Sequence, residues 1–169
     1  MPQAQLLPDI AFPPDAPPAS AAPVRYLDDL RPGERFTSAG HLLDEEQIRA
    51  FALQFDPQPF HLDDEAARGT LFGGLAASGW HTAALTMRLL VQGGLPLAGG
   101  IIGAGGEISW PRPTRPGDVL RVETEIVSVT PSRSRPERGM VVVSSQTRNQ
   151  HGDVLQQSLY KLVVPRRPA

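Results

Sequence analysis

Apolar residues recur with a helical period in the first half of the chain. The clearest run is Ile48, Phe51, Ala52 and Phe55. Asp44, followed three residues later by Gln47, is typical of a helix N-terminus, and Pro57 cannot continue a helix. The pattern therefore predicts a short amphipathic helix that begins at Asp44, packs one face on the core and ends at Asp56.

Two further helices are expected before residue 95. One is short and runs from Asp63 to Ala67. The other starts at Ser78, is apolar on nearly every side to about Val91, and is stopped by the glycines at 93 and 94. Because a helix that is apolar all round is a buried helix, we expect the helix from Ser78 to lie in the core.

Beyond residue 100 the period of the pattern changes to two. It predicts strands over Ile101–Trp110, Val119–Val129, Met140–Asn149 and Val154–Val164, after a shorter strand around Phe36. His151–Asp153 supplies a hairpin turn between the last two strands, and residues 131–139 form a polar loop. Short or polar connections and one long buried helix predict an α+β fold, in which an antiparallel sheet curls around that helix.

The N-terminal residues differ from the rest of the chain. Seven prolines punctuate an alanine-rich segment over residues 1–23. Proline interrupts both helices and sheet ladders, so we predict a flexible arm there and a single folded domain over residues 24–169. The alternative to a disordered tail is an arm that lies over a partner subunit.

Charge and cysteine content exclude several classes of function. With 16 basic and 18 acidic residues the chain has no field to attract nucleic acid, and its aromatic residues are too few for base stacking. The absence of cysteine excludes disulfides and thiolate chemistry and fits a cytoplasmic protein. No apolar run approaches the roughly 20 residues of a membrane span, and no secretory signal is evident. We expect neither a nucleic-acid nor a membrane partner.

The candidate chemistry lies between residues 51 and 90. Asp56 and His61 are five residues apart, on a stretch that two prolines bias toward extended backbone outside any helix. Gly79 follows Ser78 at the start of the buried helix, where a backbone N–H has no acceptor within the helix. A carboxylate and an imidazole that share a water, beside such an N–H, are what adding water to a polarised double bond requires.

Two motifs around these residues resemble a known family. DPQPFHLDDEAA is similar to the hydratase signature of the MaoC-like, (R)-specific enoyl-CoA hydratases, which runs from aspartate through asparagine and proline to histidine and a second aspartate. FGGLAASGWHTAAL resembles the segment that follows in that family, where a glycine starts the central helix. A weaker resemblance extends through WPRPTRPGDVLRVETEIV and NQHGDVLQQSLYKLVV, so that roughly residues 24–164 are covered.

The resemblance implies a hotdog fold, with the antiparallel sheet wrapped around the long helix. It also implies that Asp56 and His61 are the acid-base pair of an acyl-thioester hydratase or dehydratase, and that the Gly79 N–H is the donor to the thioester oxygen. Three positions depart from the family pattern: Gln58 stands where asparagine is usual, Pro57 precedes it, and Ser78 stands where histidine is frequent. Gln58 can still orient Asp56, whereas Ser78 can cap the helix but cannot titrate.

The substrate class follows from the same resemblance. We expect a thioester of coenzyme A or of an acyl-carrier protein, no metal, and no cofactor beyond the coenzyme A of the substrate. Four residues are predicted to bind the substrate: Gln58, Phe72, Ser78 and Trp80. Arginines at 112, 115, 133, 135 and 138 could meet coenzyme A phosphates, although an ordinary solvated set explains them equally well. An open sheet edge and an incomplete acyl tunnel predict a homodimer or a higher homo-oligomer.

Several residues have alternative explanations. Asp56 could merely end a helix, and His61 could be a structural histidine. Asp56, His61 and Asp63 could hold a metal, but they lack further ligands nearby. His81 could touch substrate, although a hydrogen-bonded core histidine is the simpler interpretation. The histidines at 41 and 151, in a predicted strand and a turn, are expected to be polar side chains at the surface with no further role.

Two other functions are compatible with the sequence. One is a hotdog thioesterase, in which Asp56 directs water to the carbonyl carbon instead of the β-carbon. The other is a non-catalytic protein that binds acyl thioesters or serves as a dimerisation scaffold, because function belongs to the site and not to the fold.

Overall fold

The computed structural model describes residues 23–169, so the predicted arm, apart from its last residue, lies outside the described residues. Its strands are β1 (Arg35–Thr37), β2 (His41–Leu42), β3 (Ile102–Ser109), β4 (Val119–Pro131), β5 (Arg138–Arg148) and β6 (Val154–Pro165). Its helical elements are η1 (Leu27–Asp29), α1 (Glu45–Phe55), α2 (Pro59–Leu62), α3 (Asp64–Arg68), α4 (Gly79–Leu89) and η2 (Leu90–Gly94). All four long strands and the three helices expected from the sequence are present.

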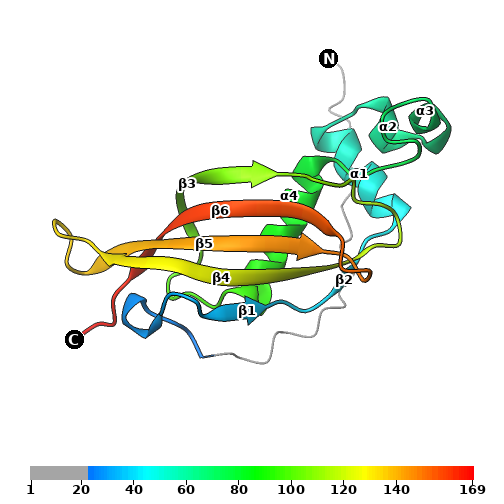
Figure 1. Ribbon diagram of the computed structural model, residues 1–169. Coiled ribbons are helices and arrows are strands. Elements are labelled where there is room, and N and C mark those ends of the chain that lie inside the picture. The colour runs from blue at the N-terminus through cyan, green and yellow to red at the C-terminus, as the bar shows by residue number, and fades with distance from the viewer. Residues whose placement is uncertain (1–22) are drawn as a thin grey trace, which may run out of the picture.

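The strands form one antiparallel sheet in the order β1-β4-β5-β6-β3, with β2 paired to β4 (Figure 1). β5 and β6 pair along almost their full length, from Arg138 opposite Pro165 to Arg148 opposite Val154. The predicted turn at His151–Asp153 closes this hairpin, with Gly152 at φ +82°, a backbone conformation that glycine adopts without strain. β3 lies at one edge of the sheet and β1 at the other.

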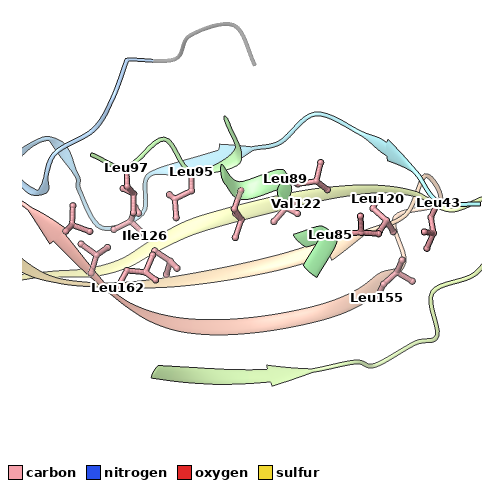
Figure 2. Packing of buried hydrophobic residues seen from close by; sticks show 14 of the residues in the cluster. Leu43, Leu85, Leu89, Leu95, Leu97, Leu120, Val122, Ile126, Leu155 and Leu162 are labelled. Atoms are coloured by element: carbon pink, nitrogen blue, oxygen red, sulfur yellow. The ribbon is translucent and has the colours of Figure 1, made fainter. Parts of the chain in front are cut away.

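α4 is the central helix around which the sheet curls (Figure 1). Its Leu85 and Leu89 belong to a cluster of buried leucine, valine and isoleucine side chains from the sheet and the connecting segments (Figure 2). Burying each such side chain contributes about 1.5–3 kcal/mol, so the cluster ties α4 to the sheet. α4 continues directly into η2, and as predicted this central helical run ends at the paired glycines, where Gly93 has φ +130°.

The small helices α1, α2 and α3 gather at one end of the sheet (Figure 1). The Asp44 carboxylate accepts the Gln47 N–H at 2.8 Å and so caps α1, as the sequence predicts. The expectation of extended backbone across the two prolines is wrong for the second half of that stretch. Pro59 occupies the first position of α2, where a helix needs no N–H, and His61 therefore lies on a helical turn.

The expectation that His41 lies at the surface is also wrong, because its side chain is buried. Its Nε2 lies 2.7 Å from Oε1 of Gln47, a buried residue of α1. Gln47 Nε2 also donates to the Leu42 carbonyl at 3.2 Å, so this residue of α1 holds β2 through two hydrogen bonds. Within residues 23–169 no helix is both long enough and apolar enough to cross a bilayer.

Candidate active site

Asp56 is fixed at the C-terminal end of α1 by two side-chain hydrogen bonds. Ser78 Oγ donates to Asp56 Oδ2 at 2.6 Å, and Gln58 Nε2 donates to Asp56 Oδ1 at 2.7 Å. Burial raises the pKa of Asp56, but the hydrogen bonds from Ser78 and Gln58, together with the nearby His61, outweigh it and hold the pKa below its ordinary value. Asp56 is therefore a carboxylate at neutral pH.

His61 faces this carboxylate from α2. Its Nε2 lies 3.4 Å from Asp56 Oδ2, and its Nδ1 lies 2.7 Å from the carbonyl oxygen of Ala76. Because a carbonyl can only accept, Nδ1 carries the proton, and Nε2 of the neutral ring is an acceptor. Phe60 and Phe72 pack around the imidazole, with ring centroids 4.6 and 5.7 Å away, and so hold its plane.

The start of α4 brings Ser78 and Gly79 to the same place. Ser78 is the N-cap: its hydroxyl accepts the Trp80 N–H at 3.2 Å while donating to Asp56, and only 1% of the residue is exposed. Gly79 is the first helical residue, so its N–H has no acceptor within α4. An indole ring fills the space beside its Cα: a Cβ there would lie 2.8 Å from Trp110.

A cavity of about 550 Å³ joins these groups. Asp56, His61 and Gly79 all line it, so the structure brings the three predicted catalytic residues together. Of the four predicted substrate contacts, Gln58, Phe72 and Trp80 also line the cavity. Ser78 does not contribute to its lining; its hydroxyl is used to orient Asp56 instead.

Sequence reasoning missed one wall of the cavity. It is formed by the segment after β3, whose lining residues are Trp110, Pro111, Arg112, Pro113 and Thr114. The only local signal was the WPRPT string, in which two prolines fix an irregular backbone. Its contact with the start of α4 depends on how β3 is placed in the sheet.

The predicted arginine cluster is divided by the fold. Arg112 lines the cavity and pairs with Asp153, while its side chain stays 61% exposed. Arg115 donates to the backbone carbonyls of Phe72, Gly74 and Leu75, and so holds the loop that carries Phe72. The other three, at 133, 135 and 138, lie at the β4–β5 turn, at the opposite end of the sheet (Figure 1).

Asp63 and His151, which the sequence also singled out, take no part in the cavity. Asp63 caps α3 by accepting the Ala66 N–H at 2.7 Å. In the described part of the chain, no three histidine or acidic side chains are grouped so that they could hold a metal ion. His151 is exposed in its turn, as expected.

His81 is only 2% exposed and stacks on Phe51, with 4.5 Å between the ring centroids. Its Nδ1 is buried and has no hydrogen-bond partner within residues 23–169. His81 is therefore not the hydrogen-bonded core histidine that was expected.

His81 makes the stability of the protein sensitive to acid. Burial, followed by repulsion from His41, lowers the pKa of His81 from 6.5 to about 4. The unfolded chain therefore takes up this proton near pH 6.5 and the folded chain only near pH 4, so the contribution to stability is complete above 6.5 and is lost as the pH falls toward 4. We expect a loss of about 2–3 kcal/mol in the free energy of unfolding.

Urea unfolding of wild type and His81→Phe at pH 7 and pH 4.5, at one protein concentration, measures this contribution. The variant keeps the stacking on Phe51 but cannot titrate, so its loss of stability between the two pH values should be smaller. His151→Phe, at the exposed turn, is the matched control and should behave as wild type. Equal losses in wild type and His81→Phe would show that His81 is not the acid-sensitive group.

The geometry favours one kind of chemistry. Asp56 Oδ2 and His61 Nε2 lie 3.4 Å apart in the cavity wall, so one water can contact both and present its oxygen to a substrate. The Gly79 N–H and the positive end of α4 can stabilise an oxyanion on that substrate. The site can thus activate water as a base and stabilise the charge that the attack creates.

Solved structures of known proteins resemble this chain in sequence and fold. The crystal structure of the MaoC-like dehydratase from Rhodospirillum rubrum is 64% identical, with a TM-score of 0.85, over 86% of this chain and 99% of that one. The (R)-hydratase of A. caviae involved in PHA biosynthesis is 26% identical, with a TM-score of 0.65, over 80% of this chain and 98% of that one.

Two curated proteins are related in sequence. YdeM of Bacillus subtilis is 33% identical over 73% of this chain and 87% of its own length. The 3-hydroxybutyryl-CoA dehydratase of Methylorubrum extorquens is 28% identical over 66% of this chain and 70% of its own length. The model of the MaoC like domain family matches residues 28–149. This chain is a member of the MaoC-like domain family, with the hotdog fold of its dehydratases and (R)-hydratases.

Proposed function

We propose that this protein is an acyl-thioester hydratase or dehydratase, which adds water to, or removes it from, the 2,3 double bond of an enoyl thioester. One observation carries the proposal: the Asp56 carboxylate, the His61 imidazole and the first residue of α4, Gly79, line the same cavity. Membership in a family with dehydratases and (R)-hydratases supports the same reaction class.

In the hydration direction, the thioester carbonyl lies against the Gly79 N–H. Asp56 and His61 take one proton from water as its oxygen bonds to C3, and the electrons of the double bond move to the thioester oxygen as an enolate. The N–H and the helix dipole stabilise that enolate. The pair then returns the proton to C2, so one water is added and no group is lost.

The carboxylate and imidazole supply the base, and the helix N-terminus supplies the hydrogen-bond donor to the enolate oxygen, so the proposed reaction uses neither metal nor redox cofactor. The carrier is coenzyme A or an acyl-carrier protein, both of which present a phosphate. The proposed contact for that phosphate is Arg112, because it lines the cavity wall and is largely exposed.

Mixing the purified chain with crotonyl-CoA tests the reaction directly. Hydration removes the ultraviolet absorbance of the conjugated enoyl thioester, leaves the thioester intact and adds the mass of one water. Release of free thiol would instead identify a thioesterase. Unchanged absorbance with crotonyl-CoA, and with longer enoyl thioesters on coenzyme A and acyl-carrier protein, would leave the non-catalytic binder as the function.

We further propose that the protein acts as a homodimer. The exposed face of α4 and the adjoining η2 carries an apolar stripe at a spacing of four, three and four residues, made of Trp80, Ala84, Met87 and Val91. Nearly every residue of the edge strand β3 is exposed as well. A second copy would cover the stripe, extend the sheet at β3 and close the cavity at Trp80.

Met87→Glu should weaken this dimer, because it places an unpaired charge in the middle of the stripe. We expect the dimer Kd to rise by about 100-fold or more. Leu159→Glu is the matched control, since Leu159 is a 41%-exposed leucine on the opposite face of the sheet. Analytical ultracentrifugation measures both, and a wild-type protein that sediments as a monomer would overturn the dimer proposal.

A further inference from the structure

The loop that leads from α3 toward α4 contacts the imidazole of His61 at two points. It consists of residues 69–76 and is called the Phe72 loop. The Ala76 carbonyl at its end accepts the Nδ1–H of His61 at 2.7 Å, and the Phe72 ring packs against the same imidazole. The position of this loop therefore decides which nitrogen of His61 carries the proton.

Most of the Phe72 loop is not fixed by apolar packing. Residues 69–74 are exposed or only partly buried, and Leu71 is 96% exposed. The first half of the loop is bonded to α3, because Thr70 Oγ1 donates to the Ala67 carbonyl at 2.7 Å. The second half depends on polar contacts with other parts of the chain.

Arg115 supplies most of those contacts. Its guanidinium donates to the Gly74 carbonyl at 2.8 Å, to the Leu75 carbonyl at 3.1 Å and also to the Phe72 carbonyl. Asp64 accepts the Leu75 N–H at 2.9 Å, so both backbone polar groups of Leu75 are bound by charged side chains. Because a guanidinium carries its donors in one rigid plane, a single arginine can hold the three carbonyls in a fixed relation to one another.

The backbone of Arg115 is itself fixed by the turn that precedes β4. Its N–H donates to Asp118 Oδ2 at 2.8 Å, and the Asp118 N–H donates to the Arg115 carbonyl at 3.1 Å. Asp118 is only 6% exposed, and its Oδ1 accepts a hydrogen bond from Asn149 Nδ2, at the turn between β5 and β6. The guanidinium therefore ties the Phe72 loop to the sheet and not only to the neighbouring helices.

We propose, building on the function above, that Arg115 is a positioning residue for His61. By holding the Phe72 loop it keeps the Ala76 carbonyl on Nδ1, and so leaves Nε2 as the nitrogen that faces Asp56. Arg115 does not line the cavity, so it acts through the loop and not on the substrate. Since a shift of about 1 Å in a catalytic group can cost about 100-fold, removing this arginine should lower kcat by about 10- to 100-fold, with a smaller effect on KM.

Nitrogen NMR of the histidine side chains tests this proposal without substrate. The chain has four histidines, so the ring signals of His61 can be assigned by their loss in His61→Gln. Wild type should show His61 protonated at Nδ1. Arg115→Met, which keeps the apolar stem but removes the donors, should show a mixture of the two neutral tautomers and a kcat for crotonyl-CoA reduced about tenfold or more.

An unchanged tautomer in Arg115→Met would overturn the proposal, whatever the rate. It would show that the burial of Leu75 and the bond from the Ala76 N–H to the Phe60 carbonyl are enough to hold the loop. A changed tautomer with a normal kcat would overturn it as well. A wild type that hydrates no enoyl thioester would overturn the proposed function instead, while the tautomer comparison would still decide the role of Arg115.

Arg35→Met is the matched control, because Arg35 is 79% exposed and pairs with Glu125 on the sheet. It should keep both the wild-type tautomer and the wild-type kcat. Arg115→Ala leaves room for a free guanidinium ion, so millimolar guanidinium should restore part of the lost kcat in this variant and none in Asp56→Asn. Failure of guanidinium to restore either the tautomer or the rate would count against the clamp.

Asp64 tests the same loop if the Arg115 variants do not fold. Asp64→Ala removes the acceptor of the Leu75 N–H, so it should change the His61 tautomer and lower kcat. Asp64→Asn keeps an acceptor oxygen and should stay close to wild type in both measurements. If Asp64→Ala also leaves the tautomer unchanged, the Phe72 loop does not position His61 and the proposal is wrong.

Discussion

Replacing Asp56 by asparagine should lower kcat/KM for the hydration of crotonyl-CoA by about 100- to 10,000-fold, the usual contribution of a positioned acid-base group. Asparagine has the same shape and can still accept the Ser78 hydroxyl bond. It has no charge to draw a proton from water, however. Because the change is isosteric and Asp56 ends α1 without a buried apolar contact to lose, the fold should be retained, as circular dichroism and thermal unfolding would show.

Asp63→Asn is the matched control for this prediction. Asp63 lies on the same stretch, two residues beyond His61, but its carboxylate caps α3. Asparagine caps helices about as well as aspartate, so both activity and stability should stay close to wild type. Near-normal hydration by Asp56→Asn would remove Asp56 from the mechanism, and equal losses in the two variants would point to a general effect of charge.

The second large effect is expected from Gly79→Ala. The new methyl group would lie 2.8 Å from the Trp110 ring, a distance that real side chains do not adopt, so either the ring or the start of α4 must move. A shift of about 1 Å in the N–H donor can cost about 100-fold in kcat. Overpacking of this kind also lowers the free energy of unfolding by about 1–3 kcal/mol.

Gly69→Ala is its control, because a Cβ at Gly69 meets no atom within 4 Å and the backbone there has φ −81°. Steady-state kinetics and urea unfolding should show little change in this variant. If collision with the indole causes the defect, then adding Gly79→Ala to a Trp110→Ala background should cost less than adding it to wild type. Additive losses would show that the methyl group acts elsewhere.

Local patterns were sufficient for most of the architecture. The period-two runs predicted β3 to β6 within a few residues, and Asp44 and the glycines at 93 and 94 predicted where α1 begins and the central helix stops. These features depend on backbone chemistry and side-chain alternation, which adjacent residues specify. The same reasoning failed at α2, because proline at the first position of a helix is as compatible with a helical turn as with extended backbone.

The sequence by itself determined which residue types could form a catalytic pair and that a helix would begin beside them. Only the tertiary structure decided how they are held: Ser78 binds Asp56 across 22 residues of chain, and Ala76 O orients His61 across 15. It also decided that Trp110, from the end of β3, packs on Gly79. Such contacts arise because the sheet and the central helix close on each other, and that closure depends on burying the whole apolar core rather than on any neighbouring residue.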